Sequence, residues 1–378
     1  MRVNAAVGIV VALSLPAAAM AQRAYLRPAP PAVIPFPVDG NSPLLWQDGR
    51  LTLFTSTGRP VLAQGFDAFS LNSPVPVRVR GARGRQVWIE SVWMDRDGTV
   101  LGWYHEEPQG LCPGTGLTAP RIGALISYDG ARTFTDLGVI LTSGAPVDCR
   151  AKNHFFGGGN GDFSVVLDEA GGYFYFLFTH YGGDVSEQGV AAARLPFEAR
   201  YNPRGAVFKY YRGDWNEPGL GGRLTPVFAA NQAWQRADPD SFWGPAVHWN
   251  TYLERWVALM NRACCEPDWR QEGIYISYSP DLARPELWSQ PRRILAGHEI
   301  GHRPGFYPQV IGLGEGETDT VVGRIGRLYV HGRSQWEIVF QRNGEYEEDP
   351  LEPPPGSIRP EMPAGWSDSE IKADLARQ

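Results

Sequence analysis

Lysine is almost missing from this sequence: its 378 residues include only Lys152, Lys209 and Lys372, and the formal net charge is −6. A surface that follows the phosphates of a nucleic acid needs a cluster of basic side chains, and an anionic membrane surface attracts a similar cluster. An acidic chain with so little lysine therefore predicts neither a nucleic acid nor a membrane as its partner.

Long apolar runs and helical periodicity are missing as well. Beyond residue 21, no segment approaches the ~20 apolar residues that a membrane-spanning helix requires, and none keeps an apolar period of about 3.6 residues. In contrast, the chain holds 44 glycines and 32 prolines, which supply turns between short strands. These features predict an all-β protein.

The first 21 residues have the pattern of a secretory signal peptide. Arg2 precedes an apolar stretch at residues 5–15, and Ala19-Met20-Ala21 forms a small-x-small cleavage site. An N-terminal anchor that stays uncleaved is the alternative. The sequence has no Asn-x-Ser/Thr sequon, which suits export by a bacterium. We expect a secreted or periplasmic protein with no membrane anchor after cleavage.

Cysteine is scarce, with four residues, and none has a finger-like spacing to other cysteines or histidines, so zinc is not expected. Export permits disulfides, and four cysteines allow three pairings. Cys112 and Cys149 flank one predicted strand and form the preferred bridge. Cys264 and Cys265 are adjacent, which leaves open a vicinal disulfide or two reduced thiols.

One pattern occurs five times: a short apolar strand, a turn that often contains Asp-Gly or Gly-Gly, and a second strand rich in aromatic and β-branched residues. The five strand pairs lie at residues 42–46 and 51–55, 90–94 and 100–105, 162–167 and 173–180, 244–248 and 255–261, and 307–311 and 327–331. A third strand follows three of them, at residues 122–128, 189–195 and 273–278. Repeated units of this kind predict a five-bladed β-propeller.

The repeats are expected to form one domain. A single blade cannot bury both of its faces, so the ring is a cooperative unit, predicted here for residues 22–343. Residues 344–378 form an acidic, Pro-rich tail, in which residues 367–377 are predicted to form a short helix. We expect a monomer.

The chemistry is expected where the innermost strands converge on the propeller axis. Two of the five residues that open the blades are carboxylates, and Asp39 lies three residues before the first; the openings are Ser42, Glu90, Asp162, Gly244 and Tyr307. Hydrolysis of a glycosidic bond needs two carboxyls, one that donates a proton and one that acts as base or nucleophile. Asp39, Glu90 and Asp162 are therefore the candidate catalytic residues.

Three polar side chains at strand ends are candidates for substrate binding. His105 and Glu107 follow the second strand of the second blade, where Glu106 or Glu107 is an alternative to Glu90 as the acid. His180 ends the corresponding strand of the third blade, close to Asp162 if the hairpin is regular. The alternative is that these are ordinary hydrogen-bonded strand ends.

Two tryptophans and one arginine complete the candidates for substrate binding. Trp215 lies in residues 209–222, a predicted long loop of the kind that often binds ligands. Trp243 precedes the opening of the fourth blade, and Arg303 leads into the fifth. Tryptophan faces stack on sugar rings, although most aromatic residues of a propeller fill the space between blades.

The strings Asp162-Phe163-Ser164-Val165-Val166 and Trp243-Gly244-Pro245-Ala246-Val247 resemble blade openings of glycoside hydrolase family 43, the arabinanase and xylosidase-like enzymes. The resemblance spans roughly residues 35–340 as a rhythm of repeats. It implies a five-bladed propeller hydrolase in which three carboxylates serve as base, pKa modulator and acid. The chain departs from that pattern: Ser42 stands at the base position, Glu90 replaces an Asp, Asp162 replaces a Glu, and no Glu precedes Gly244.

A second resemblance concerns a turn. Residues 127–134 (Ser-Tyr-Asp-Gly-Ala-Arg-Thr-Phe) resemble the Asp-box of sialidases, with Ala131 where that motif has glycine. In sialidases the box is a structural turn remote from the site, so a turn between two strands of a blade is expected here.

Together these features predict a secreted carbohydrate-active hydrolase that acts on an oligo- or polysaccharide. A propeller that binds a glycan or a protein without catalysis is the alternative, and a sialidase-like enzyme is a third. The predicted chemistry requires no cofactor. A structural Ca2+ held by inward carboxyls and carbonyls is a further option.

Overall fold

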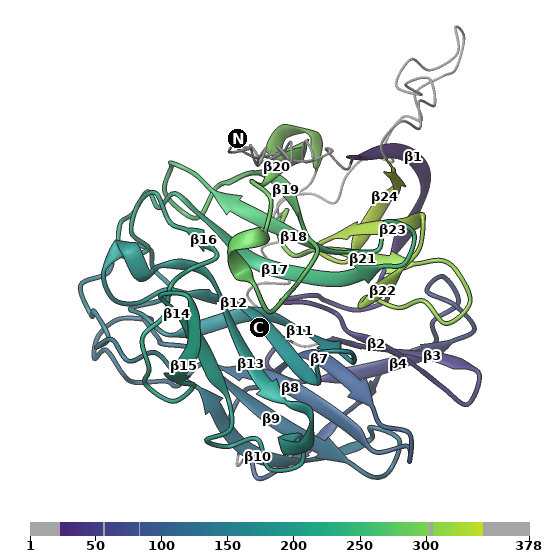
Figure 1. The fold of residues 1–378 in the computed structure, drawn as a ribbon, viewed down its shortest axis with the longest axis horizontal. Coiled ribbons are helices and arrows are strands. Elements are labelled where there is room, and N and C mark those ends of the chain that lie inside the picture. Colours follow the sequence, from purple (N-terminus) through teal and green to yellow (C-terminus); the bar gives the residue numbers. More distant parts are fainter. Residues whose placement is uncertain (1–22, 56, 83, 302–304, 343–378) are drawn as a thin grey trace, which may run out of the picture.

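The computed structural model describes residues 23–55, 57–82, 84–301 and 305–342. Its strands form five sheets around a common centre (Figure 1), so the predicted all-β, five-bladed β-propeller is confirmed. In these ranges the helical residues are short 3-10 turns: η1 (Val185–Glu187), η2 (Phe197–Ala199), η3 (Pro285–Leu287) and η4 (Gly297–Glu299). None of the helices described is long and apolar enough to cross a membrane. The predicted signal peptide and the tail lie outside the described residues.

Each sheet is one blade, with its innermost strand named first. Blade one contains β2 (Leu44–Gln47), β3 (Arg50–Thr55), β4 (Val61–Gly65) and β5 (Val75–Pro76). Blade two contains β7 (Trp88–Met94), β8 (Val100–Glu106), β9 (Arg121–Ser127), β10 (Thr133–Leu141) and β6 (Arg78–Arg80), which pairs with β10 in parallel. Blade three contains β11 (Asn160–Asp168), β12 (Tyr173–His180), β13 (Gly189–Pro196), β14 (Phe208–Tyr211), β15 (Asp214–Pro218) and β16 (Phe228–Ala229).

Blades four and five complete the ring. Blade four contains β17 (Ser241–Asn250), β18 (Arg255–Ala263), β19 (Gln271–Ser279), β20 (Arg292–Ala296) and β22 (Val321–Val322), which runs parallel to β17. Blade five contains β21 (Pro308–Gly312), β23 (Ile325–Val330), β24 (Arg333–Gln341) and β1 (Arg23–Val33). All five predicted strand pairs coincide with the two inner strands of a blade.

The core is divided into apolar layers between neighbouring blades. One layer packs Trp103 of β8 against Phe174 and Phe176 of β12, and another packs Val257 of β18 against Leu328 of β23. Similar layers lie between blades one and two, three and four, and five and one. A strand between two neighbours is buried on both faces, which explains why inner strands such as β12 (YFYFLFTH) lack polar alternation.

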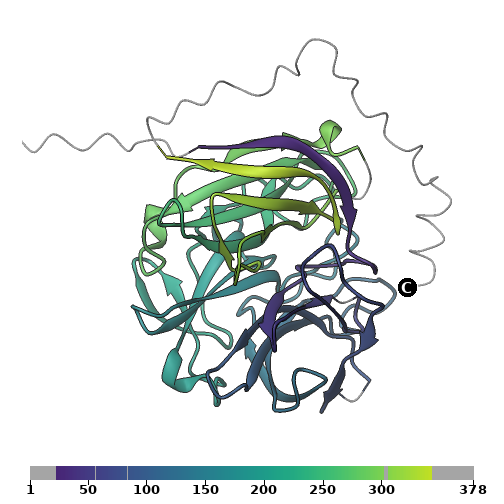
Figure 2. The ribbon, with the colours of Figure 1, turned by 90° about the vertical axis from the view of Figure 1, so that its right-hand side faces the viewer.

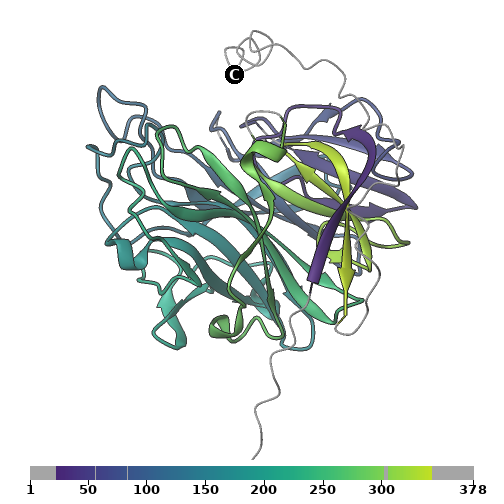
Figure 3. The same cartoon turned by 90° about the horizontal axis from the view of Figure 1, so that it is seen from above.

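The N-terminal segment closes the ring. β1 pairs antiparallel with β24 and so supplies the outermost strand of the last blade. Figures 2 and 3 both show β1, in purple, beside the yellow strands from the other end of the chain. β1 contains Pro28, Pro30 and Pro31, which suit an edge strand because proline has no N–H to donate to a further neighbour. The sequence pattern did not predict this strand.

A second closure lies at the inner strands. The backbone N–H of Ser42 donates to Gln309 Oε1 at 3.0 Å, and Gln309 Nε2 donates to the Ser42 carbonyl at 2.6 Å. Gln309 belongs to β21 of blade five and is buried. Its amide therefore completes the backbone hydrogen bonds of Ser42, ahead of the first strand of blade one.

The segment at residues 209–222 differs from the prediction. It is not a long loop: β14 and β15 form a hairpin that extends blade three outward. Trp215 in β15 donates from Nε1 to the Ala283 carbonyl at 2.9 Å, and its ring packs on Tyr175 and Tyr210. Trp215 is thus a packing residue of the outer blade, and the structure does not bring it to the carboxylates.

Two other expectations about loops are confirmed. Cys112 and Cys149 form the expected disulfide with a Cα–Cα distance of 5.3 Å. Cys264 and Cys265, for which the sequence left a disulfide and two thiols open, form a vicinal disulfide. The Asp-box is the turn between β9 and β10, in which Asp129 Oδ1 accepts from the Thr133 N–H at 2.8 Å.

Replacement of Gln309 by alanine tests the inner closure. It leaves the buried N–H and C=O of Ser42 without partners, and each such group costs about 1–3 kcal/mol, so we expect the free energy of unfolding to fall by about 2–4 kcal/mol in urea titrations. Gln64→Ala is the matched control, because within the described ranges the Gln64 side-chain amide donates to the Thr52 hydroxyl at a partly buried position and serves no ring closure. Equal losses in the two variants would contradict the role given to Gln309.

Candidate active site

Backbone bulges aim the candidate acids at the propeller axis. In β7 the pairing with β8 skips Glu90, between the pairs of Ile89 and Ser91. In β11 the pairing with β12 skips Asp162, whose φ is +40°. A bulged residue is unpaired and its side chain is redirected, which is common next to active sites. The equivalent positions of two blades thus bring two carboxyls together, as the alignment of blade openings predicted.

The segment before β2 passes directly over Glu90. Gly40 has a φ of +133°, and a Cβ placed there would lie 3.2 Å from Glu90 Cδ, so this crossing requires glycine. Asn41 Nδ2 donates to the carbonyls of Phe163 (2.8 Å) and Pro245 (3.0 Å), which ties the segment to blades three and four. Asp39 is therefore held above the axis with the other two acids.

Glu90 is fully engaged by the protein. Its Oε2 accepts the backbone N–H groups of Phe163 (3.1 Å) and Asn41 (3.5 Å), and its Oε1 contacts Nδ1 of His105. The Glu90 side chain is 1% exposed. Its carboxyl group is therefore held in a fixed, buried position, with contacts from the protein to both oxygens.

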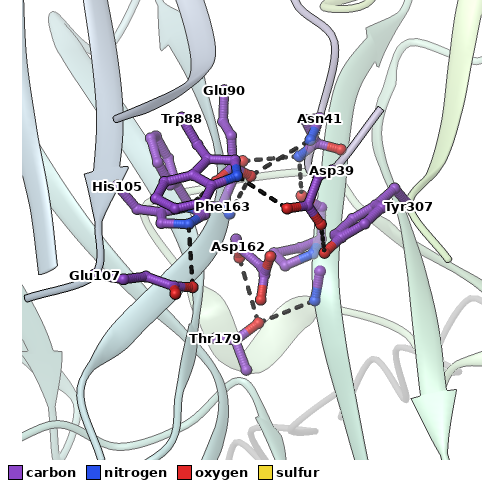
Figure 4. Close-up of polar contacts among 12 residues, drawn as sticks. Asp39, Asn41, Trp88, Glu90, His105, Glu107, Asp162, Phe163, Thr179 and Tyr307 are labelled. Carbon is purple, nitrogen blue, oxygen red and sulfur yellow. Dashed lines mark hydrogen bonds and ion pairs between the residues drawn. The ribbon is translucent and has the colours of Figure 1, made fainter. Parts of the chain in front are cut away.

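Asp162 and Asp39 each bind phenol or indole donors. The hydroxyl of Tyr181 donates to Asp162 Oδ2. Trp88 Nε1 donates to Asp39 Oδ2 at 3.0 Å, and the hydroxyl of Tyr307 donates to Asp39 Oδ1 at 3.1 Å. Figure 4 shows Asp39, Asp162, Trp88 and Tyr307 converging from different elements on one space.

His105 lies between two carboxylates. Its Nδ1 contacts Glu90, and its Nε2 lies 3.7 Å from Glu107 Oε1. The Trp88 ring stacks on the imidazole with 4.8 Å between centroids and 12° between planes. Of this group, Glu107 is nearest to solvent, with a side chain 24% exposed against 6% for His105.

Burial and neighbouring negative charges raise the pKa values of Asp162 and Asp39 above those of ordinary aspartates. Burial, together with the charge of Glu90, raises the pKa of Asp162 to about 7. Burial also raises the pKa of Asp39, although the hydrogen bond from Trp88 acts in the opposite direction. Asp162 is therefore protonated up to about pH 7.

The imidazole supplies the positive charge of the cluster. Burial by itself lowers the pKa of His105, but the charge of Glu90 and the contacts with Glu107 outweigh burial, and the pKa lies well above its ordinary value. His105 is therefore an imidazolium that partly balances Glu90. The structure places His105 and Glu107 beside the candidate acids, and their predicted role in substrate binding stays a prediction.

The alternative acid Glu106 faces away from the axis. Neighbouring residues of a strand point to opposite faces, and the Glu106 carboxylate binds Arg85 and Arg121 there. It is a structural ion pair within blade two and not a member of the carboxylate cluster.

His180 faces away for the same reason. Thr179 and Tyr181 contact Asp162, so the residue between them lies on the other face of the blade. There the His180 imidazole contacts the side-chain amide of Asn160, and burial lowers its pKa to about 3. The structure does not place His180 at the acids, because the strand alternation puts Tyr181 there instead.

Trp243 and Arg303 have different outcomes. Trp243 is 2% exposed and packs edge-on against Tyr307 at 5.6 Å, so it supports the site from below and offers no open face to a sugar. Arg303 lies outside the described residues, and its predicted role stays a prediction.

A cluster of aromatic rings supports the two phenols. Tyr181 packs on Phe156 (4.5 Å), Trp234 (5.2 Å) and Trp269 (5.8 Å), as measured between ring centroids. The cluster reaches Tyr307 through Trp243. It fixes the direction of the hydroxyls that donate to Asp162 and Asp39.

Four residues of this site were missed at first. Tyr307 was recognised as a blade opening but was given no role. Trp88 could have been found because it lies two residues before Glu90, on the same face of the strand. Asn41 and Tyr181 carry no local signal, because their partners come from other blades or from beyond a strand end.

A calcium ion does not fit the buried cluster. Glu90, His105 and Asp162 each offer one ligand atom, all within 4.8 Å of one another. Ca2+ prefers about six to eight oxygen ligands, whereas this set includes an imidazole nitrogen. The carboxylate oxygens also already bind His105, Phe163 and Tyr181.

No family model and no curated protein sequence matches this chain. Similar solved structures include the endo-arabinase of Bacteroides thetaiotaomicron, 12% identical with a TM-score of 0.48, over 84% of this chain and 98% of that one. A thermostable family-43 glycoside hydrolase is 11% identical with a TM-score of 0.48, over 84% and 94% of the chains. An exo-β-1,3-galactanase of Clostridium thermocellum is 12% identical with a TM-score of 0.45, over 82% and 62%. At this level of similarity, the function has to be argued from the site.

Asp162→Asn tests the buried proton through stability alone. The ordinary pKa is 3.8, and the folded-state value of Asp162 is about 7, so the contribution of Asp162 to stability is greatest below about pH 4 and is lost as the pH rises through 7. Asparagine mimics the protonated carboxyl and does not ionise. We expect the free energy of unfolding of the variant, relative to wild type, to increase between about pH 4 and pH 8.

The control for this comparison is Asp168→Asn, in the turn after β11, where Oδ1 accepts from the Gly171 N–H in exposed surroundings. Its difference from wild type should stay level over the same pH range. A level difference for Asp162→Asn as well would show that Asp162 is ionised throughout.

Proposed function

We propose that this chain hydrolyses glycosidic bonds of an oligo- or polysaccharide, with Asp162 as the general acid and Asp39 as the general base or nucleophile. The observation that carries the proposal is a pair of carboxyls in different hydrogen-bonding environments. Asp162 binds one phenol and has a pKa raised to about 7, whereas Asp39 binds an indole and a phenol. Two carboxyls whose surroundings separate their protonation states are what acid/base hydrolysis of a glycosidic bond requires.

Asp162 is suited to donate a proton to the leaving oxygen. Burial and Glu90 hold the proton on its carboxyl, and the Tyr181 hydroxyl binds Oδ2. The pKa of Tyr181 lies well above its ordinary value because of burial and the charge of Asp162, so the phenol stays protonated. Tyr181 also stabilises the carboxylate that remains after proton transfer.

Glu90 is assigned the role of pKa modulator. Both of its oxygens are occupied by His105 and by backbone N–H groups, so it has no oxygen for substrate or water. Its charge is the main reason, after burial, that Asp162 keeps its proton. This supports the family-43 assignment of roles that the sequence resemblance implied, with Asp39, Glu90 and Asp162 as base, modulator and acid.

Asp39 is suited to act on water or on the sugar. The residue keeps some exposed surface although its carboxyl group is buried enough to raise its pKa, and Trp88 and Tyr307 orient both of its oxygens. Neutral donors of this kind fix a carboxylate without neutralising its charge. The reaction assigned to this site uses no metal ion.

The acidic surroundings disfavour a sialidase-like reaction. A sialic acid carboxylate needs a clamp of arginines, and within the described ranges no arginine forms an ion pair with Asp39, Glu90, Glu107 or Asp162. We also propose that the protein is exported, which is supported by its two disulfides, since these persist in oxidising compartments.

The test is release of reducing sugar from plant and bacterial polysaccharides and from aryl glycosides. We expect Asp162→Asn and Asp39→Asn to lower kcat/KM by about 10²–10⁴-fold on polysaccharides, the usual contribution of a general acid or base. Asp162→Asn should cost less on aryl glycosides with good leaving groups, which need little protonation. In wild type, kcat/KM should decline as the pH rises through about 7, where Asp162 loses its proton.

Glu272→Gln is the matched control, because Glu272 is 22% exposed and pairs with Arg293 on the outer part of blade four. Unchanged hydrolysis in either aspartate variant would overturn the assigned roles. Saturable glycan binding without hydrolysis by the folded wild type would favour the non-catalytic propeller.

A further inference from the structure

Phe155 is an exposed aromatic ring on the same side of the propeller as the candidate acids. It belongs to the loop that leads from β10 into β11, and it is 48% exposed. A single exposed aromatic residue is ordinary on a protein surface. Phe155 differs in how firmly it is held and in what lies beside it.

The backbone around Phe155 is anchored on two sides. The buried Asn153 Oδ1 accepts from the N–H groups of Phe155 (2.8 Å) and Phe156 (2.9 Å). The Phe155 carbonyl accepts from the Thr118 N–H at 2.9 Å, and the Thr118 carbonyl accepts from the Gly157 N–H at 2.8 Å. This short ladder joins the loop to the one that leads from β8 into β9.

The same two loops are joined covalently by the disulfide between Cys112 and Cys149. The Phe155 ring itself packs edge-on against Trp269 at 5.3 Å between centroids, with 73° between planes. An edge contact leaves a face of the ring open. The loop is therefore built to hold an aromatic face in solvent, where an apolar ring would otherwise be unfavourable.

A series of ring contacts leads from Phe155 to the acid. Phe155 lies 6.4 Å from Phe156, and Phe156 lies 4.5 Å from Tyr181, between ring centroids. The Tyr181 hydroxyl donates to Asp162. Two ring-to-ring contacts thus connect the exposed Phe155 with the phenol that binds Asp162.

We propose that Phe155 is the platform of a second sugar subsite, on which a glycan chain rests while another of its residues lies at Asp162. The inference rests on the proposed function, because it takes the chain to be a carbohydrate. The apolar face of a pyranose or furanose ring stacks on a flat aromatic face, and its hydroxyls remain directed outward. Lys152 and His154, on either side of the anchor Asn153, are exposed and add hydrogen-bond donors near this ring in the sequence.

The test measures glycan binding by the Asp162→Asn variant, so that hydrolysis of the probe does not affect the result. The probes are β-1,3-galactan, arabinan and xylan, and their oligosaccharides of increasing length, in affinity electrophoresis and calorimetry. We expect Phe155→Ala to weaken binding of the longer chains by about 3- to 10-fold, the effect of losing one aromatic stacking contact. Binding of the shortest oligosaccharides should not change.

Two further variants distinguish the loss of a stacking surface at Phe155 from a general loss of glycan binding. Phe155→Trp keeps a flat ring and should retain or strengthen the binding of long chains. Tyr128→Ala removes another exposed ring, 76% exposed in the Asp-box turn, and should have no effect. In the active protein, Phe155→Ala should raise KM for long chains and leave kcat unchanged.

Equal binding of long chains by Phe155→Ala and its parent would overturn the subsite, whether or not the protein hydrolyses glycans. The absence of saturable binding to every probe would overturn it as well. In contrast, length-dependent binding that Phe155→Ala reduces, in a wild type without hydrolysis, would support the subsite and reject the proposed reaction.

Discussion

Two carboxyl groups, Glu90 and Asp162, lie close together in the buried centre of this propeller, and both cannot carry a charge there at little cost. Glu90 binds two backbone N–H groups and an imidazolium, whereas Asp162 binds one phenol. Burial and the charge of Glu90 raise the pKa of Asp162, so the proton stays on Asp162 below about pH 7. The proposed acid chemistry and the expected dependence of stability on pH both follow from this unequal division.

The backbone has to bring these groups together against that electrostatic cost. It does so with bulges at Glu90 and Asp162 and with a glycine at position 40, where a side chain would meet Glu90. Closure of the ring by β1 and Gln309 keeps blade one, and hence Asp39, in place beside blades two and three. The stability of the whole ring thus supports the geometry of a few atoms at its axis.

The loops around the axis hold the site in place through aromatic packing and a disulfide. Aromatic rings hold Tyr181 and Tyr307 in the direction of the aspartates, and the same cluster extends to the exposed Phe155. The disulfide between Cys112 and Cys149 ties together the loops that carry this extension. Packed aromatic rings therefore connect Asp162 with the sugar platform proposed at Phe155.

The sequence predicted the strand pairs, the five blades and the carboxylates at the blade openings, because short apolar runs and turns are local patterns. So was the pairing of Cys112 with Cys149. The hairpin at β14–β15 was taken for a loop, and β1 was not recognised, because each becomes a strand only through its partner in the folded sheet.

The identity of the side chains that touch the acids was decided by tertiary structure alone. Strand alternation placed Tyr181 at Asp162 and directed His180 away, and bulges shifted the alternation by one residue at Glu90 and Asp162. Residue type by itself determined that acids and bases were present in this chain. Which carboxyl keeps a proton depends on burial and on neighbours from other blades, and those exist only once the ring has closed.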